Sequence, residues 1–342
     1  MNQLGLVVIG RNEGDLLRAC LLSVADKVER VVYIDSGSID GSIEIAQALG
    51  IEVVELDLNT PFTAARARNA GFTRLMAIAP GIKFVQFVDG DCEVADGWLE
   101  TALLELQSRP EVAVVCGRRR ERYPRRSVYN LLCDLEWNTT VGEAKACGGD
   151  AMMRVSAFQQ VSGFNSTLIA GEEPELCLRL RWQGWKILRI KAEMTFHDAR
   201  ITEFSQWWNR NKRSGHAYAE GAWLHGRSRE QHWVKETKSI WFWGFVLPLF
   251  TLSTAWLTQG WSLFLLIGYP ILIYRIYSRK KQEVPNRTAF VYAWFCAIGK
   301  FAQAQGQIRF YLARLCQRQS TLVEYKTLAT NIKTVSYEKN SG

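Results

Sequence analysis

Five short apolar runs, separated by longer segments of helical character, restrict the fold of the first third of the chain. The connections between the runs are 15 to 30 residues long, which is enough for a helical crossover between parallel strands. The runs are apolar without alternation, as expected of strands buried on both faces. The sequence therefore predicts an α/β domain with a mostly parallel sheet covered by helices. The predicted strands are residues 5–9, 30–34, 51–56, 83–88 and 112–116.

Acidic residues follow two of these strands where each strand ends. The second strand leads into Asp35, and the fourth leads into Asp89-Gly90-Asp91. In such a sheet, ligands bind at the carboxyl ends of the strands, and an Asp-x-Asp pair supplies oxygen ligands that suit Mg²⁺ or Mn²⁺. Asp, Ser and Gly also begin loops and cap helices, so a purely local role stays open, above all for Asp35.

A second acidic site is predicted downstream, at the start of a helix. Pro174 suits the first position of a helix, and Leu176, Leu180 and Trp185 give that helix a buried face. Glu172 and Glu173 would then lie at or just before its N-terminus, where the helix dipole favours an ionised carboxylate. Beside a pocket, such a carboxylate can accept a proton from a hydroxyl. Ordinary N-terminal helix charge is the alternative.

Residues 239–274 contain no charged side chain. Since a membrane span needs roughly 20 residues, we expect a transmembrane helical hairpin over 240–257 and 261–277, with a pair of buried core helices as the alternative. The positive-inside rule then predicts that both ends lie in the cytoplasm. The flanking basic residues are Arg227, Arg229, Lys235, Lys238, Arg275, Arg279, Lys280 and Lys281.

The net charge of +8 favours a polyanionic partner or surface. Residues 118–120 are all arginine, but no nucleic-acid module accompanies them, so we expect a solvated loop or one facing lipid or substrate phosphates, and no nucleic acid. The eight cysteines show no Cys-x-x-Cys spacing, which indicates reduced thiols in the cytosol. No secretory signal pattern is present in residues 1–10.

Six ordered motifs resemble those of the family two glycosyltransferases with the GT-A fold, over about residues 4–200. Six motifs in one order are far more specific than any single one. The motifs are Ile9-Gly10-Arg11-Asn12-Glu13, Asp35-Ser36-Gly37-Ser38-x-Asp40-Gly41, Ala65-Arg66-Ala67-Arg68-Asn69-x-Gly71, Asp89-Gly90-Asp91, Gly148-Gly149-Asp150 and Gly171-Glu172-Glu173-x-Glu175-Leu176.

The resemblance implies a nucleotide-sugar site that binds Mg²⁺ or Mn²⁺. Asp35 resembles the carboxylate that bonds the base, Arg68 reaches toward the nucleotide, and Asp89 and Asp91 resemble the ribose and metal ligands. Asp91 is the stronger metal candidate, and His197 matches an occasional third ligand. The residues expected to line the nucleotide pocket are Gly10, Arg11, Asn12, Glu13 and Ser38.

The resemblance also implies an acceptor side and a catalytic base. Asp150 matches an acceptor-side position. Glu173 falls where the usual Glu-Asp motif of the family has its catalytic Asp, so a longer side chain replaces it. We expect Glu173 to be the base, with Glu172 as the other candidate.

The segment 206–216 before the uncharged stretch suits a helix at the membrane surface, because it contains both tryptophans and basic residues. Arg210 and Arg213 are candidates for reaching the diphosphate. The Gln-x-x-Arg-Trp motif of processive polysaccharide synthases is absent, which favours transfer of a single sugar. The apolar residues 289–302 predict an interfacial helix or core packing, and the polar tail after about Ser320 is uninformative.

These expectations combine into a membrane-anchored, metal-dependent, inverting glycosyltransferase on the cytoplasmic face of the inner membrane. The donor would be a UDP- or GDP-sugar, and the acceptor a lipid-linked or glycan hydroxyl in exopolysaccharide or envelope glycan synthesis. A catalytically silent scaffold of an envelope-assembly complex is the alternative. The expected domains are residues 1–235 for the GT-A domain, 236–280 for the hairpin, and 281–342 for an interfacial helix and tail.

Overall fold

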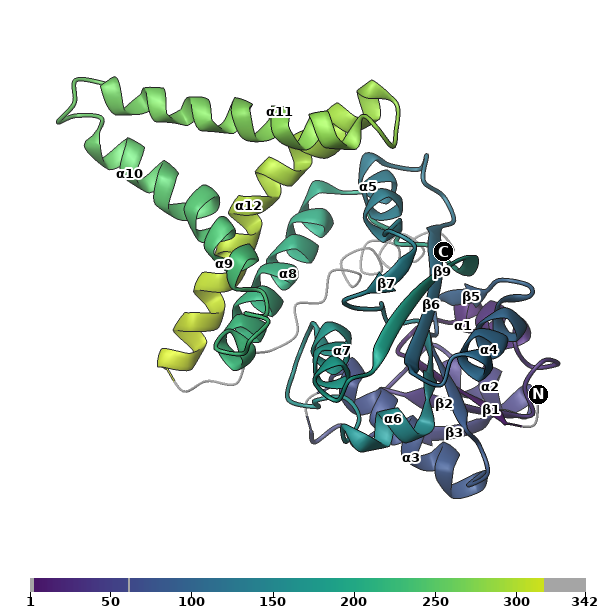
Figure 1. Ribbon diagram of the computed structural model, residues 1–342. Helices are drawn as coiled ribbons and strands as arrows, with labels where there is room; N and C mark the ends of the chain where they lie inside the picture. Colours follow the sequence, from purple (N-terminus) through teal and green to yellow (C-terminus); the bar gives the residue numbers. More distant parts are fainter. Residues whose placement is uncertain (1–2, 61, 317–342) are drawn as a thin grey trace, which may run out of the picture. The chain divides into compact units, whose positions relative to one another are not determined.

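The computed structural model describes residues 3–60 and 62–316. The chain divides into two compact units, residues 1–200 and 201–342, and each is described here by itself (Figure 1). The division after Arg200 differs from the domain limits expected at residues 235 and 280, which remain predictions. The polar tail lies outside the described residues.

The first unit is built on a mixed sheet with the strand order β3-β2-β1-β4-β8-β6-β9-β5, and β7 pairs with β9. The strands β1, β2, β3, β4, β6 and β9 run in one direction, and β5, β7 and β8 run in the other. The mostly parallel α/β sheet is therefore confirmed. The strands are β1 Leu4–Gly10, β2 Arg30–Asp35, β3 Glu52–Glu55, β4 Phe84–Asp89, β5 Cys92–Val94, β6 Val112–Glu121, β7 Gly142–Ala144, β8 Ala151–Arg154 and β9 Lys186–His197.

Helices connect the strands of this unit, and local residues explain several of their positions. The Thr63 side chain caps α3 by accepting from the Arg66 backbone N–H. Gly71 lets α3 approach β1 closely, since a Cβ there would lie 2.3 Å from Val7 Cγ1. The helices are α1 Asp15–Leu22, α2 Ser42–Ala48, α3 Ala64–Ile78, α4 Trp98–Ser108, α5 Val128–Trp137, α6 Val155–Gln160 and α7 Glu172–Trp182.

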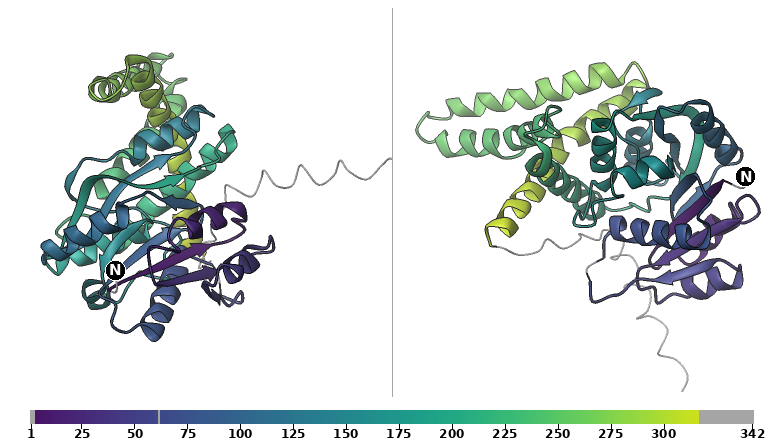
Figure 2. Two further views of the ribbon diagram at one scale, coloured as in Figure 1. Left: turned by 90° about the vertical axis from the view of Figure 1, so that its right-hand side faces the viewer. Right: turned by 60° about the horizontal axis from the view of Figure 1, so that its bottom comes forward.

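The second unit is helical, and its apolar segment reverses direction at residues 255–260. Gly260 has a φ of 89° at this turn, and Ser262 Oγ donates to the Thr251 carbonyl across it at 2.8 Å. Figure 2 shows the two arms in green. The elements are α8 Phe204–His225, α9 Val234–Trp241, a π-helical turn Phe242–Val246, α10 Leu247–Thr254, a 3-10 segment Trp261–Ile267, α11 Gly268–Lys280 and α12 Asn286–Leu315.

One helix among the described residues, Trp261–Lys280, is long and apolar enough to cross a membrane. The turn therefore lies where the sequence predicts it, while a hairpin with two spans remains a proposal. The third apolar stretch belongs to the 30-residue helix α12, which packs on α8. A Cβ on Gly215 would lie 2.0 Å from the Gln303 carbonyl oxygen, and one on Gly306 would lie 2.0 Å from that of Lys212. These two helices therefore pack backbone against backbone.

Candidate active site

Two of the predicted acidic residues lie at the carboxyl ends of β2 and β4, the two strands that flank β1. In the register of the sheet, Asp35 on β2 lies opposite Gly10 on β1, and Asp89 on β4 lies opposite Ile9. The two carboxylates are therefore separated by two strand spacings, or about 10 Å along the sheet edge. This distance suits opposite sides of one nucleotide site.

Asp35 is fully buried, and both of its oxygens have partners. Tyr33 Oη donates to Oδ2 at 2.8 Å, and the backbone N–H groups of Gly37 and Ser38 donate to Oδ1, each at 2.8 Å. Burial and Asp35 raise the pKa of Tyr33 well above its ordinary value, so the phenol stays a donor. The carboxylate is thus held rigidly, and its role toward a base remains a prediction.

The loop after β1 is tied to the loop after β2. The Asn12 backbone N–H donates to Ser38 Oγ at 2.9 Å, and Asn12 Oδ1 accepts from the Ile39 N–H at 2.8 Å. Asn12 has a φ of 55°, a conformation that asparagine tolerates better than most residues. The structure therefore brings together the segments that carry Gly10, Arg11, Asn12, Glu13 and Ser38.

Asp89 lies between two arginines. Arg68 Nη2 donates to Oδ1 at 2.8 Å, and Arg119 Nη2 donates to Oδ2 at 2.9 Å. Burial raises the pKa of Asp89, but the two guanidinium groups outweigh it and hold that pKa at about 2. Asp89 is therefore ionised throughout the physiological range.

Asp150 is fully buried, immediately before β8. Its Oδ1 accepts from the Asp89 backbone N–H at 3.0 Å, while its Oδ2 accepts from Arg119 Nε at 2.8 Å and from Thr195 Oγ1 at 2.7 Å. These bonds join β4, β6 and β9 at one point. Asp150 thus supports Asp89, and direct contact with an acceptor remains a prediction.

The helix α7 brings the two candidate bases to the same place. Arg68 Nη1 lies 2.9 Å from Glu172 Oε1 and 3.2 Å from Glu173 Oε1. Burial and the neighbouring Glu172 raise the pKa of Glu173 to about 7, against the opposing effect of Arg68. Such a pKa suits a general base that works near neutral pH.

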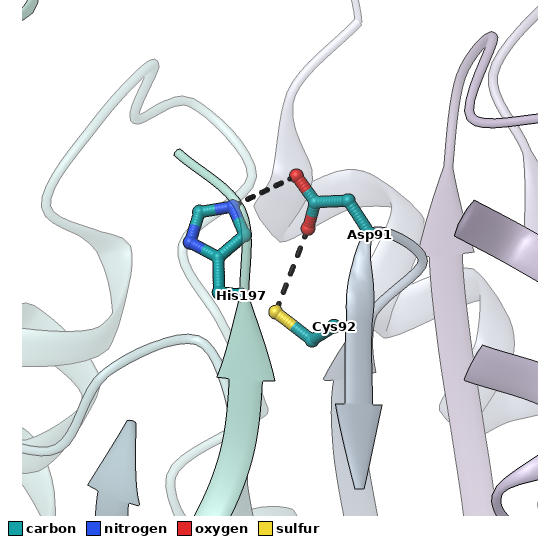
Figure 3. Close-up of side chains that lie close together, drawn as sticks. All are labelled: Asp91, Cys92 and His197. Atoms are coloured by element: carbon teal, nitrogen blue, oxygen red, sulfur yellow. Dashed lines mark hydrogen bonds and ion pairs between the residues drawn. The ribbon is translucent and has the colours of Figure 1, made fainter. Parts of the chain in front are cut away.

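Asp91 and His197 are in contact, and their role as metal ligands remains a prediction. Figure 3 shows His197 Nε2 facing Asp91 Oδ2 at 3.0 Å, and Cys92 Sγ lying 3.5 Å from Asp91 Oδ1. These three residues form one possible ligand group, while Asp89 belongs to a second group with Cys92 and Asp150. Carboxylate and imidazole donors fit a divalent ion such as Mn²⁺.

Arg119 and Cys92 are site residues that the sequence reasoning missed. The arginine run 118–120 lies in β6 rather than in the expected solvated loop, and its members point to different partners. Arg118 pairs with Asp134, and Arg120 pairs with Glu193. Arg119 instead pairs with Asp89 and Asp150. The side-chain alternation of a strand was the available signal.

The two diphosphate candidates lie elsewhere in the chain. Arg210 and Arg213 are both on α8, in the second unit. Their roles toward a diphosphate remain predictions.

Comparisons with known proteins show which family and fold the chain resembles. The family model "Glycosyl transferase family 2" matches residues 6–161. A TPR repeat-containing protein of Synechococcus elongatus is 31% identical over 136 residues, which are 40% of this chain and 32% of that protein. The O-antigen chain rhamnosyltransferase RfbN of Salmonella typhimurium is 24% identical over 217 residues, which are 58% of this chain and 67% of that protein.

The chain spans less than half the length of the first curated relatives that it matches. The matched regions are 32% and 44% of those proteins. Among solved structures, a mannosyltransferase of Pyrobaculum calidifontis in complex with GDP-Man and Mn²⁺ superposes with a TM-score of 0.56 and 16% identity. The match covers 90% of this chain and 87% of that chain. This likeness supports the expected fold. Residues 6–161 of the N-terminal unit therefore resemble glycosyl transferase family 2, and the unit has the GT-A fold.

Proposed function

We propose that this protein transfers a sugar from a nucleotide diphosphate sugar to an acceptor hydroxyl by a single displacement with inversion. One observation carries the proposal: the buried Arg68 bonds both the strand-end carboxylate Asp89 and the helix-end carboxylate Glu173. A residue of the predicted donor site and the predicted base are thereby held at one centre. The match of residues 6–161 to the glycosyl transferase family 2 model supports the same reaction class.

Glu173 acts as the general base in this proposal. The acceptor oxygen attacks the anomeric carbon while its proton passes to a Glu173 oxygen. The bond from that carbon to the diphosphate oxygen breaks, and its electron pair leaves with the nucleoside diphosphate. A pKa of about 7 lets Glu173 be ionised at neutral pH and still hold a proton after transfer.

Asp91 and His197 would hold the divalent ion, Mg²⁺ or Mn²⁺. When bound, the ion supplies positive charge that offsets the charge developing on the departing diphosphate. Arg68 and Arg119 do not take part in stabilising the diphosphate in this proposal, because their N–H groups already donate to Asp89, Asp150 and Glu172. They hold the acidic residues in place.

The acceptor in this proposal is lipid-linked or part of a growing envelope glycan. The hairpin of residues 240–257 and 261–277, whose second arm lies in the helix Trp261–Lys280, would anchor the enzyme in the inner membrane, with the N-terminal unit facing the cytoplasm. Basic residues at both ends of the uncharged stretch support this orientation. The O-antigen chain named in the relative RfbN is an envelope glycan of this kind.

A donor screen with matched variants tests the reaction. Purified wild-type protein with Mn²⁺ is incubated with a panel of UDP- and GDP-sugars and polyprenyl phosphate or lipid-linked saccharide acceptors, and transfer and donor hydrolysis are measured. Asp91→Ala and Glu173→Gln should both lose transfer. The control Glu100→Gln changes an exposed acid in the first turn of α4 and should retain it. Undiminished transfer by the first two variants rejects the mechanism, and no transfer with any donor favours the scaffold alternative.

A further inference from the structure

The Cys92 thiol is shared by both groups of possible metal ligands. Its Sγ lies within 4.8 Å of ligand atoms of Asp91 and His197, and also within 4.8 Å of ligand atoms of Asp89 and Asp150. The side chain is fully buried. The Cys92 sulfur therefore lies between the carboxylates of Asp89 and Asp150 and the imidazole of His197.

The sheet explains why this sulfur faces the histidine. Cys92 on β5 is directly opposite His197 on the antiparallel strand β9, and opposite residues of such a pair project from the same face of the sheet. Asp91 directly precedes β5 and turns its carboxylate toward both side chains, as Figure 3 shows. Three donor atoms of different chemistry thus converge.

Their spacing suits a single ion. Ligand atoms about 2.0–2.3 Å from an ion in tetrahedral geometry lie about 3.3–3.8 Å from one another. The sulfur of Cys92 is 3.5 Å from Asp91 Oδ1, and His197 Nε2 is 3.0 Å from Asp91 Oδ2. These three side chains need to move only a small distance to bind one ion together.

We propose that Cys92 is a direct ligand of the divalent ion, together with Asp91 and His197. On binding, the S–H bond breaks, the proton leaves to the solvent, and the sulfur bonds to the ion as a thiolate. Thiolate and imidazole donors select Zn²⁺ and Co²⁺ over Mg²⁺, which prefers oxygen. The site would then bind thiophilic ions more tightly than an all-oxygen site does. The inference rests on the metal site of the proposed function, but not on the transfer reaction.

Titration of the full chain with Co²⁺, without any sugar donor, tests this ligand. The background variant Cys316→Ser removes an exposed thiol. In this background, binding should produce the intense near-ultraviolet absorption of a cobalt–thiolate bond. Adding Cys92→Ser should abolish that band and weaken Co²⁺ and Zn²⁺ binding by at least about tenfold, with little effect on Mg²⁺ binding.

A matched control and a second measurement separate the outcomes. Cys20→Ser changes another buried thiol near the centre, whose sulfur lies 3.8 Å from the Asp89 carbonyl oxygen, and it should keep the band. If Cys92→Ser does not fold, zinc X-ray absorption spectroscopy of the background protein is the second measurement. It shows whether the ligands of the bound zinc include a sulfur atom at about 2.3 Å. Absence of the band, its persistence in Cys92→Ser, or a shell without sulfur overturns the inference. If Mn²⁺-dependent transfer persists in that case, the proposed function stands.

Discussion

Arg68 Nη1 lies 3.2 Å from Glu173 Oε1, and the same guanidinium group bonds Asp89 at 2.8 Å. The arginine is almost fully buried, so it links an acid at the end of β4 to an acid at the start of α7 away from solvent. A small movement of Arg68 would move both carboxylates. The predictions below follow from this link and from the close packing around it.

Glu173→Gln should lower kcat by about 100- to 10,000-fold, the usual contribution of a general base. The amide keeps the shape of the side chain but cannot accept the proton. Glu172→Gln serves as the comparison, because Glu172 is bonded to Arg68 at 2.9 Å and should show a smaller loss. Steady-state kinetics with a saturating donor measure both variants. A larger loss in Glu172→Gln would assign the base to Glu172.

The pH profile should report the raised pKa of Glu173. Because burial and Glu172 place this pKa at about 7, kcat/KM should rise about tenfold per pH unit below 7 and level off above it. An ascending limb near pH 4.5, the ordinary value for a glutamate, would show that Glu173 is not the titrating base.

The same pKa has an effect on stability. The folded state holds the Glu173 proton more tightly than the unfolded state does, so its contribution is full below about pH 4.5 and is lost as the pH rises through about 7. The unfolding free energy of the wild type relative to Glu173→Gln should fall across this window. Urea unfolding at several pH values measures it, and a flat difference contradicts the raised pKa.

Arg68→Met should destabilise the protein by about 3–5 kcal/mol, because it leaves buried carboxylates without their partner. It should also move the pH midpoint of kcat/KM upward, since Arg68 lowers the pKa of Glu173. Arg68→Lys keeps the charge but loses the fork that reaches two acids, so its effects should be smaller. Urea unfolding and the pH profile measure the two effects, and an unchanged midpoint in Arg68→Met would count against the link.

Gly149→Ala should impair the centre without altering any charge. A Cβ at residue 149 would lie 2.5 Å from Arg68 Nη2 and 2.9 Å from Asp89 Oδ2, and overpacking of this kind destabilises by about 1–3 kcal/mol. Gly148→Ala is the matched control, because no atom lies within 4 Å of the added methyl group. Thermal unfolding and transfer rate measure the pair. Equal behaviour of the two variants would show that the tight contact at residue 149 is unimportant.

Much of the first unit could be predicted from its residues. The apolar runs gave the strands β1, β2, β3, β4 and β6, and strand-end positions brought Asp35 and Asp89 to one edge of the sheet. Those signals are local, since each depends on a few neighbouring residues. The turn of the apolar segment was also predictable, because Gly260 adopts the left-handed conformation that glycine allows.

Other features depend on long-range pairing that no local pattern contains. The short strand β8 lies antiparallel between β4 and β6. It has only four residues and ends in the charged Arg154, so its apolar run is too short to be predicted as a strand. Strand alternation separates Arg119 from Arg118 and Arg120, but it does not identify its partners. Asp89 and Asp150 lie 30 and 31 positions away along the chain.

The pairing of Asp91 with His197 joins residues that are 106 positions apart, and the bond from Arg68 to Glu172 spans 104. During synthesis, the nascent chain emerges from its N-terminus. A ribosome that has released β1 to β4 has therefore exposed the acidic strand ends long before their partners exist. The centre can be completed only after residue 197 has left the exit tunnel, so the proposed metal site exists only in chains with a finished N-terminal unit.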